Sequence, residues 1–265
     1  MRIEGDLAGR SVILVASLDR PDAKLLPLLF ALATARDLGA RSVGLVAPYL
    51  PFMRQDREFH RGEGMSARHF AELLSRSVDW VLTVDPHLHR IHRLDELFTV
   101  PVEVAHSAPA IAAWIRDSVP QPLVIGPDQE SEQWVEAVAR AAGAPWAVLL
   151  KHRRGDREVE LRLPELGPPA GREPVLVDDI ISTGVTMRQA VTLLRGGGFA
   201  PPRCVAVHAV FAGDAEAELR RVGAKDVVTC NSLAHPSNRI DVLPALLEGM
   251  QRILAGAPEP ALGAR

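Results

Sequence analysis

The sequence predicts an α/β protein of two domains, each built on a mainly parallel β-sheet flanked by helices. At 265 residues the chain exceeds one average domain and suits two of ordinary size. Short apolar runs rich in β-forming residues alternate with segments of helical periodicity, which is typical of parallel sheets with right-handed crossovers. Several polar clusters follow directly after an apolar run, where open α/β sheets bind their ligands.

Composition narrows the class of protein. The hydrophobic content of 47% and the charged content of 24% are those of a globular protein. A net charge of −3 gives no positive field that would favour nucleic acid. No apolar run approaches the length of about 18 residues that a membrane helix needs, and the N-terminus lacks the apolar core of a signal peptide. Cys204 and Cys230 lie in or beside apolar runs and suggest buried thiols rather than a metal pair. We therefore expect a cytoplasmic protein that binds neither nucleic acid nor membranes.

The first expected domain comprises residues 1–105, with the boundary in the segment Val104–Ala108 after a proline-bearing β-like run. Apolar β-forming runs predict three strands, and apolar residues at helical spacing predict two helices. Pro27 is expected to disturb the first helix slightly, and Ser66 to cap the second. The strands are expected at Val12–Ala16, Ser42–Val46 and Trp80–Val84, and the helices at Asp22–Leu38 and Ser66–Ser75.

The second expected domain comprises residues 106–265. The glycines 196–198 end one helix, and Gly155–Arg172 predicts an excursion with short extended pieces because it is rich in proline and charge. The tail Ala255–Arg265 is expected to fray. The strands are expected at Leu123–Ile125, Trp146–Leu150, in the run from Val175, at Val205–Val210 and at Asp226–Cys230, and the helices at Ala108–Asp117, Ser131–Ala142, Met187–Leu194, Asp214–Val222 and Val242–Leu254.

The run Val175-Leu-Val-Asp-Asp-Ile-Ile-Ser-Thr-Gly-Val-Thr186 carries the strongest functional signal. A strand end delivers two adjacent carboxylates, which suit the hydroxyls of a sugar, and a Ser/Thr/Gly turn follows at the start of a helix, where backbone N–H groups bind phosphate. An acidic cap that binds nothing is the alternative, but a cap needs one such residue and this turn has five. The candidate ligands of a phosphorylated sugar are Asp178, Asp179, Ser182, Thr183, Gly184, Val185 and Thr186.

A charged loop follows the strand that ends near Val46 and carries Arg54, Gln55, Asp56 and Arg57. Two guanidinium groups suit a polyphosphate, and an amide or a carboxylate can read a base edge or a ribose. A solvated loop without a ligand is the alternative, because charge runs are usually exposed to water.

Three further strand ends carry polar residues: Thr83-Val-Asp-Pro-His87, Val124-Ile-Gly-Pro-Asp128 and Lys151-His-Arg-Arg154. His87 with the neighbouring His89 and His92 suggests zinc, but cysteine partners and a matching spacing are missing. The basic residues after the strand Trp146–Leu150 have the alternative role of solvating the strand exit.

All five blocks occur in the order found in ribose-phosphate pyrophosphokinases, the synthetases of 5-phosphoribosyl-1-pyrophosphate (PRPP), which the chain resembles from about Ile13 to near Cys230. The run from Val175 looks like the PRPP motif that these enzymes share with type I phosphoribosyltransferases, and its Ile-Ile-Ser-Thr-Gly is similar to archaeal-type members. The block Pro48–Leu74 resembles the flexible loop of the synthetases, which ordinary phosphoribosyltransferases lack.

The resemblance implies two type I phosphoribosyltransferase-like domains, with residues 1–105 on the ATP side and residues 106–265 on the ribose 5-phosphate and PRPP side. The implied reaction transfers the pyrophosphoryl group of ATP to the C1 hydroxyl of ribose 5-phosphate and gives PRPP and AMP. The family requires Mg²⁺ and usually forms homo-oligomers, as dimers or hexamers. The resemblance further assigns Lys151 and Arg153 to catalysis, Arg54, Gln55, Asp56, Arg57 and His87 to ATP, and His87 and Asp128 to the metal.

The chain departs from the family pattern in three places. Gln129-Glu-Ser-Glu132 replaces the small residues and glycines that usually follow the aspartate, and Ser182 replaces an aspartate of many relatives. The relatives carry roughly forty further residues before the counterpart of Ile3, so the chain is expected to be short at its N-terminus. Two rival functions stay open: a salvage phosphoribosyltransferase that consumes PRPP, and a non-catalytic regulatory partner of a synthetase.

Overall fold

The computed structural model describes residues 1–58, 60–88, 90–91, 93–154, 158–162 and 171–256. The chain folds into two compact units. The N-terminal unit comprises Met1–Ala105 together with helix α7 (Leu243–Gly256), and the C-terminal unit comprises His106–Val242. Within the described residues, no helix is both long and apolar enough to cross a membrane.

The N-terminal unit contains a parallel sheet of four strands in the order β1 (Ser11–Val15), β2 (Ser42–Val46), β3 (Trp80–Val84) and β4 (Val102–Ala105). These strands form because each is a short run of mainly β-branched or apolar residues. The remaining elements of this unit are α1 (Pro21–Asp37), α2 (Ser66–Ser75) and the short 3-10 helix η1 (Leu94–Glu96).

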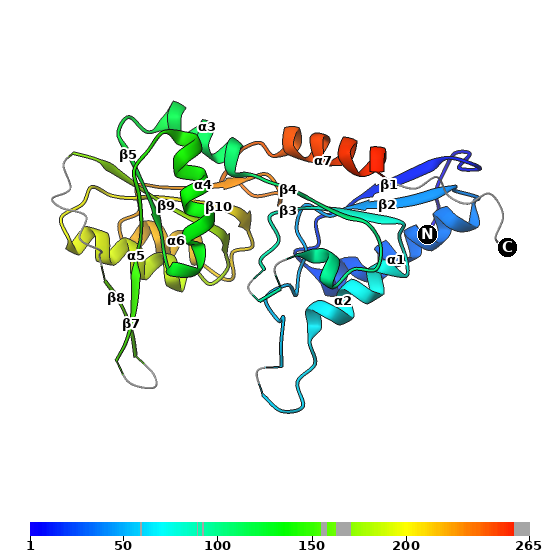
Figure 1. Ribbon diagram of the computed structural model, residues 1–265, viewed down its shortest axis with the longest axis horizontal. Helices are drawn as coiled ribbons and strands as arrows, with labels where there is room; N and C mark the ends of the chain where they lie inside the picture. Colours follow the sequence, from blue (N-terminus) through cyan, green and yellow to red (C-terminus); the bar gives the residue numbers. More distant parts are fainter. Residues whose placement is uncertain (59, 89, 92, 155–157, 163–170, 257–265) are drawn as a thin grey trace. The chain divides into compact units, whose positions relative to one another are not determined.

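Helix α7 packs on β3 and β4 of the N-terminal unit, as Figure 1 shows. A Cβ atom on Gly249 would lie 2.8 Å from Leu82 Cδ1, so a glycine at this position lets the helix approach the sheet closely. The sequence-based division placed residues 106–265 in one C-terminal domain, which differs from this arrangement. The amphipathic pattern of a helix shows which of its faces is buried but not which sheet it covers.

The C-terminal unit contains a parallel sheet of six strands. Its helices are α3 (Ala108–Ser118), η2 (Gln129–Ser131), α4 (Glu132–Ala142), α5 (Val185–Gly196) and α6 (Ala215–Arg221). The strand order is β12 (Asn238–Ile240), β11 (Asp226–Cys230), β10 (Arg203–Ala209), β9 (Glu173–Ile181), β5 (Pro122–Gly126) and β6 (Trp146–Val148).

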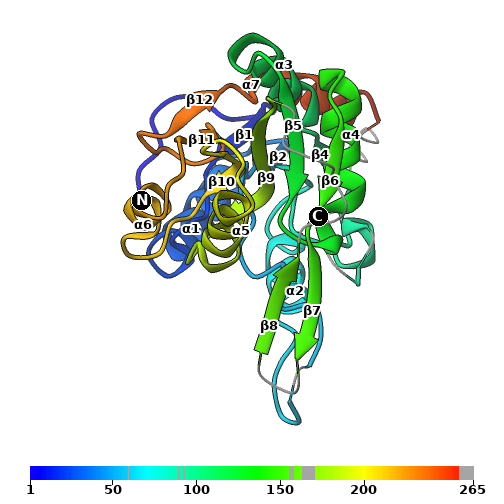
Figure 2. The same cartoon turned by 90° about the vertical axis from the view of Figure 1, so that its left-hand side faces the viewer.

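An antiparallel ribbon of β7 (Leu150–Arg154) and β8 (Glu158–Arg162) follows β6 and extends away from the six-stranded sheet, as Figure 2 shows. The sequence predicted one strand over Trp146–Leu150 and a basic loop after it. That prediction is wrong in detail, because the parallel strand ends at Val148 and residues 150–154 form a second strand with a new partner.

The two parallel sheets confirm the predicted α/β class, and Ser42–Val46, Trp80–Val84, Ser66–Ser75 and Asp226–Cys230 have the predicted bounds. The expected cap is wrong: Met65 is the N-cap of α2, and the Ser66 hydroxyl binds Gln55 instead. Pro27 lies inside the continuous helix α1. Both cysteines are buried, as expected, and burial raises the pKa of Cys204 to about 12. The expected fraying of the tail falls on residues 257–265, outside the described residues, whereas Ala255 and Gly256 end α7.

Candidate functional site

The turn Ser182–Gly184, called the β9–α5 turn below, connects β9 to the N-terminus of α5. Gly184 is the N-cap of α5 and has a φ of 69° in the left-handed region, which favours glycine. The Arg188 N–H donates to the Gly184 carbonyl at 2.8 Å and so begins the helix. Thr183 and Val185 are exposed, while Ser182 and Thr186 are half-buried. The turn therefore offers hydroxyls and the open N–H groups of a helix start to an anion.

A second turn supports the β9–α5 turn. The Phe211 N–H donates to the Ile181 carbonyl at 2.9 Å, and the Ala212 N–H donates to the Ser182 carbonyl at 3.0 Å. A Cβ atom on Gly184 would lie 3.5 Å from the Cβ of Ala215. Residues 210–214 lie between β10 and α6 and are called the β10–α6 turn below. Through these bonds they pack against the β9–α5 turn and support it.

Asp178 and Asp179 lie near the carboxyl end of β9 and are half-buried. The Asp179 N–H donates to Asp178 Oδ1 at 3.0 Å. Burial raises the pKa of Asp178 well above its usual value, and the negative charges of Asp179 and Asp128 raise it further. The three carboxylates therefore share one region at the ends of the neighbouring strands β5 and β9, where sugar hydroxyls or a cation would relieve their repulsion.

Asp128 is presented by a tight connection between β5 and α4. The Ser131 hydroxyl donates to the Asp128 carbonyl at 2.7 Å. A Cβ atom on Gly126 would lie 2.5 Å from Ser131 Oγ and 2.8 Å from a Val148 methyl group, so only glycine fits where the strand ends. Asp128 was predicted from the sequence, whereas the role of Gly126 and Ser131 in holding it was not.

The structure places Lys151 and Arg153 on strand β7, where they pair with Leu161 and Val159 of β8. The basic motif therefore lies on a β-ribbon and not on the expected loop. A ribbon fixes the backbone of both residues by main-chain hydrogen bonds.

In the N-terminal unit, Arg54 and Arg57 are exposed in the connection after β2. Gln55 is half-buried, and its Oε1 accepts a hydrogen bond from the Ser66 hydroxyl at 2.5 Å. The Ala67 N–H also donates to the Gln55 carbonyl at 3.2 Å. Gln55 therefore ties the loop to the start of α2.

Asp56 is only 5% exposed and accepts two hydrogen bonds from Arg90, one from the backbone N–H at 3.0 Å and one from Nη1 at 3.2 Å. Burial alone would raise the pKa of Asp56, but these bonds and the positive charge of Arg90 lower it below its usual value. Arg90 was not among the residues predicted from the sequence, although a basic residue just after the strand-end His87 was a usable signal.

His87 is half-buried after β3, in the N-terminal unit, whereas Asp128 belongs to the C-terminal unit. His89 and His92 of the zinc alternative lie outside the described residues. In the described part of the chain, no group of three or more His, Cys, Asp or Glu side chains is placed to hold a metal ion. A metal here would need ligand atoms from a substrate in addition to protein side chains.

Comparison with known proteins gives two family matches. Residues 1–77 match the model of the N-terminal domain of ribose phosphate pyrophosphokinase, and residues 95–244 match the phosphoribosyl transferase domain. A ribose-phosphate pyrophosphokinase of Methanopyrus kandleri is 32% identical over 96% of this chain and 86% of its own length. One from Saccharolobus solfataricus is 32% identical over 88% of this chain and 80% of its own. The crystal structure of the phosphoribosylpyrophosphate synthetase of Mycobacterium smegmatis superposes with a TM-score of 0.81 at 25% identity, covering 96% of this chain and 86% of that one.

Proposed function

Because the chain belongs to the ribose-phosphate pyrophosphokinase family, we propose that it transfers the pyrophosphoryl group of ATP to the C1 hydroxyl of ribose 5-phosphate, giving PRPP and AMP. The observation that carries this proposal is the pairing of two family models along one chain. A nucleobase phosphoribosyltransferase would explain the match of residues 95–244 to the phosphoribosyl transferase domain. It would not explain why residues 1–77 match the N-terminal domain of ribose phosphate pyrophosphokinase. The family predicted from the sequence is thereby confirmed.

The C-terminal unit supplies the ribose 5-phosphate side of the proposed reaction. Asp178 and Asp179 orient the ribose hydroxyls, because carboxylates accept the hydrogen bonds that hydroxyls donate. The 5-phosphate binds the N-terminus of α5, and its ligands are Ser182, Thr183, Gly184, Val185 and Thr186. The exposure of Thr183 and Val185 and the left-handed backbone of Gly184 support this assignment.

The N-terminal unit supplies the ATP side. Arg54 and Arg57 are exposed and suit the phosphate oxygens, while Gln55 and His87 complete the nucleotide contacts. Asp56 serves this side through Arg90, because its carboxylate is buried and already accepts two hydrogen bonds.

We propose Mg²⁺ as the metal, with His87 as the candidate ligand of the N-terminal unit and Asp128 as that of the C-terminal unit. The negative region around Asp128, seen in the raised pKa of Asp178, suits a divalent cation. Because the described residues contain no three-ligand cluster, phosphate oxygens and water complete the coordination. Bound there, the ion neutralises charge on the phosphates.

Lys151 and Arg153 are the proposed catalytic residues. Attack of the C1 hydroxyl on the β-phosphorus of ATP develops negative charge on the bridging and equatorial oxygens, which the two cations neutralise. Arg54 assists as AMP leaves. The remaining acceleration comes from holding the two substrates in position. We propose that the enzyme works as a homo-oligomer, a dimer or a hexamer, in the cytoplasm.

One experiment tests the function against both rivals. The protein is incubated with ATP, Mg²⁺ and ribose 5-phosphate, and AMP and PRPP are measured; PRPP is then offered with nucleobases. AMP formation that requires both the sugar and Mg²⁺ supports the proposal, and its loss on chelation supports the metal. Nucleotide formation from PRPP instead would show a salvage transferase, and silence in both assays would show a non-catalytic partner.

A further inference from the structure

Backbone hydrogen bonds join the β10–α6 turn to the β9–α5 turn, so the position of the β10–α6 turn helps to set that of its neighbour. Two hydrogen bonds run from it to Ile181 and Ser182, and Ala215 just beyond it lies against Gly184. The backbone of Phe211 has a φ of 23°, a left-handed value that an aromatic residue rarely adopts. Such a conformation persists only where the surroundings hold it.

The ring of His235 packs against the ring of Phe211 and so helps to keep Phe211 in this conformation. The rings of Phe211 and His235 have centroids 4.6 Å apart at an interplanar angle of 47°. Both residues are half-buried, and the contact joins the β10–α6 turn to the segment between β11 and β12. Aromatic contacts of this kind have a preferred geometry and so fix the ring on each side.

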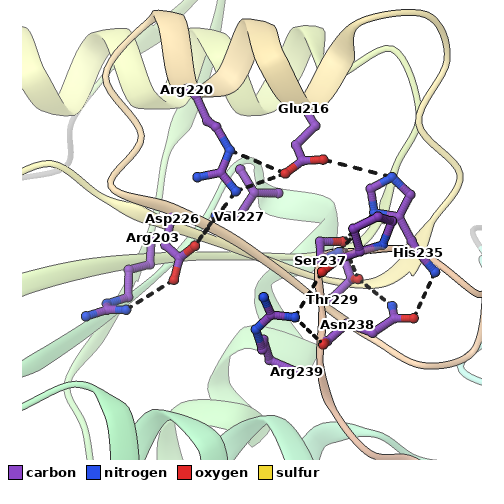
Figure 3. A network of polar contacts seen from close by, with 11 residues as sticks. Arg203, Glu216, Arg220, Asp226, Val227, Thr229, His235, Ser237, Asn238 and Arg239 are labelled. Carbon is purple, nitrogen blue, oxygen red and sulfur yellow. Dashed lines mark hydrogen bonds and ion pairs between the residues drawn. The ribbon is translucent and has the colours of Figure 1, made fainter.

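His235 is in turn fixed by a polar network, shown in Figure 3. The Ser237 N–H donates to His235 Nδ1 at 3.2 Å, and the Ser237 hydroxyl lies 2.8 Å from the same nitrogen. The backbone bond makes Nδ1 an acceptor and leaves the ring proton on Nε2, which lies 3.9 Å from Glu216 Oε2.

Further hydrogen bonds connect this network to α6 and to strand β11. Glu216 also accepts hydrogen bonds from Arg220, at 2.9 and 3.3 Å. Ser237 is 4% exposed and lies 2.8 Å from the hydroxyl of the fully buried Thr229. The backbone N–H of His235 donates a hydrogen bond to Asn238 Oδ1 at 2.9 Å. The imidazole is therefore held from strand β11, from α6 and from its own turn.

We propose that Phe211 and His235 are positioning residues, which hold the β9–α5 turn in the geometry that binds the phosphate of the sugar substrate. This inference rests on the proposed function, because it assigns the phosphate to that turn. Neither side chain touches the substrate. Their effect passes through the backbone bonds from Phe211 and Ala212 to Ile181 and Ser182.

The test measures steady-state kinetics of AMP formation in Phe211→Ala, His235→Ala and the double variant. Losing an aromatic contact of this type is expected to raise the KM for ribose 5-phosphate roughly three- to tenfold, with a smaller change in kcat and an unchanged KM for ATP. The KM of the double variant for ribose 5-phosphate should exceed that of the more affected single variant by no more than about twofold, because the two substitutions remove the same contact. His235→Phe keeps a ring but loses the bonds to Ser237, so its KM should lie between those of His235→Ala and the wild type.

A matched variant separates positioning from general destabilisation. Phe199→Leu alters a buried ring in the core of the same unit, before β10 begins, and should lower the melting temperature without changing the KM for ribose 5-phosphate. Isothermal calorimetry with ribose 5-phosphate repeats the comparison without turnover.

The two proposals fail in different ways. If the wild type forms no AMP from ATP and ribose 5-phosphate, the proposed function is wrong. If the wild type is active but Phe211→Ala and His235→Ala keep the normal KM, or raise it only as far as Phe199→Leu does at equal loss of stability, the positioning role is wrong.

Discussion

The carboxylate of Asp56 accepts hydrogen bonds from both the backbone N–H and the side chain of Arg90, at 3.0 and 3.2 Å. Asp56 follows β2 and Arg90 follows β3, so an ion pair between a buried carboxylate and a half-exposed guanidinium joins two segments that the sequence separates by 34 positions. Both segments carry proposed nucleotide ligands, Arg54 and Arg57 on one and His87 on the other. The ion pair therefore fixes the two segments that carry these proposed nucleotide ligands to one another.

Asp56→Ala is expected to destabilise the protein by about 1–3 kcal/mol, because it leaves the Arg90 N–H without its acceptor and removes a buried charge. Asp56→Asn keeps an acceptor oxygen and should lose less. Urea unfolding measures both variants. Glu72→Ala, which removes an exposed carboxylate on α2, is the control and should change the free energy of unfolding little. Equal stability of Asp56→Ala and the control would contradict a structural role for the pair.

Glu173 should make stability depend on pH in the acid range. Its carboxylate accepts hydrogen bonds from Arg203 and from Lys225, the latter at 3.0 Å to both oxygens. Burial would raise the pKa of Glu173, but these bonds lower it below the ordinary value of 4.5. A lowered pKa in the folded state means that stabilisation is complete above the unfolded value and is lost as the pH falls through the folded value.

The pH effect is measured by urea unfolding of the wild type and of Glu173→Gln from neutral pH down to about pH 3. At neutral pH the variant should be less stable by about 1–2 kcal/mol, and the gap should close below the ordinary pKa of 4.5. A gap that stays constant across this range would show that the charge of Glu173 does not stabilise the fold.

The strands were largely predictable because buried parallel strands are short apolar runs, as Ser42–Val46 and Trp80–Val84 show. The antiparallel ribbon was not, since Leu149 continues the apolar run and hides the change of partner between β6 and β7. The short strand β12 (Asn238–Ile240) has too few residues to show periodicity.

The sequence pointed to residues of the proposed site where polar or turn-forming residues follow a strand, as at Asp178 and Gly184. The proposed positioning residues Phe211 and His235 could not be found in this way, because they lie far from the strand β9 in the sequence and their contact depends on the fold. Their residue types alone carry no sign of a binding role. Only the folded chain brings the ring of His235 to Phe211, at a centroid distance of 4.6 Å.

Lys151→Ala is expected to lower kcat by orders of magnitude while leaving the KM for ribose 5-phosphate nearly unchanged, because the proposed role of its charge is to stabilise the transition state. His152→Ala, one residue further along β7, is the matched control and should keep near-normal turnover. The measurement is AMP release under saturating ATP. Near-normal turnover in Lys151→Ala, or an equal loss in His152→Ala, would contradict the assignment.

A pair of glycines separates backbone strain from ligand binding at the β9–α5 turn. Gly184 and Gly143 have nearly the same left-handed backbone, with φ values of 69° and 66°, and both lie at a helix end in the same unit. Substitution by alanine should therefore cost each variant about 1 kcal/mol of stability. The surroundings differ, because a Cβ atom on Gly143 would meet nothing within 4 Å, whereas one on Gly184 would lie 3.5 Å from Ala215 Cβ and 3.7 Å from its carbonyl oxygen.

Gly184→Ala is thus expected to raise the KM for ribose 5-phosphate several-fold, since relief of the strained backbone moves the N–H groups at the start of α5 that are proposed to bind the phosphate. Gly143→Ala should have a similar melting temperature and a normal KM. Kinetics and thermal unfolding of both variants together provide the measurement. If the two variants share the same KM, the anion does not bind at the N-terminus of α5, because the backbone strain is matched and only Gly184 belongs to the proposed binding surface.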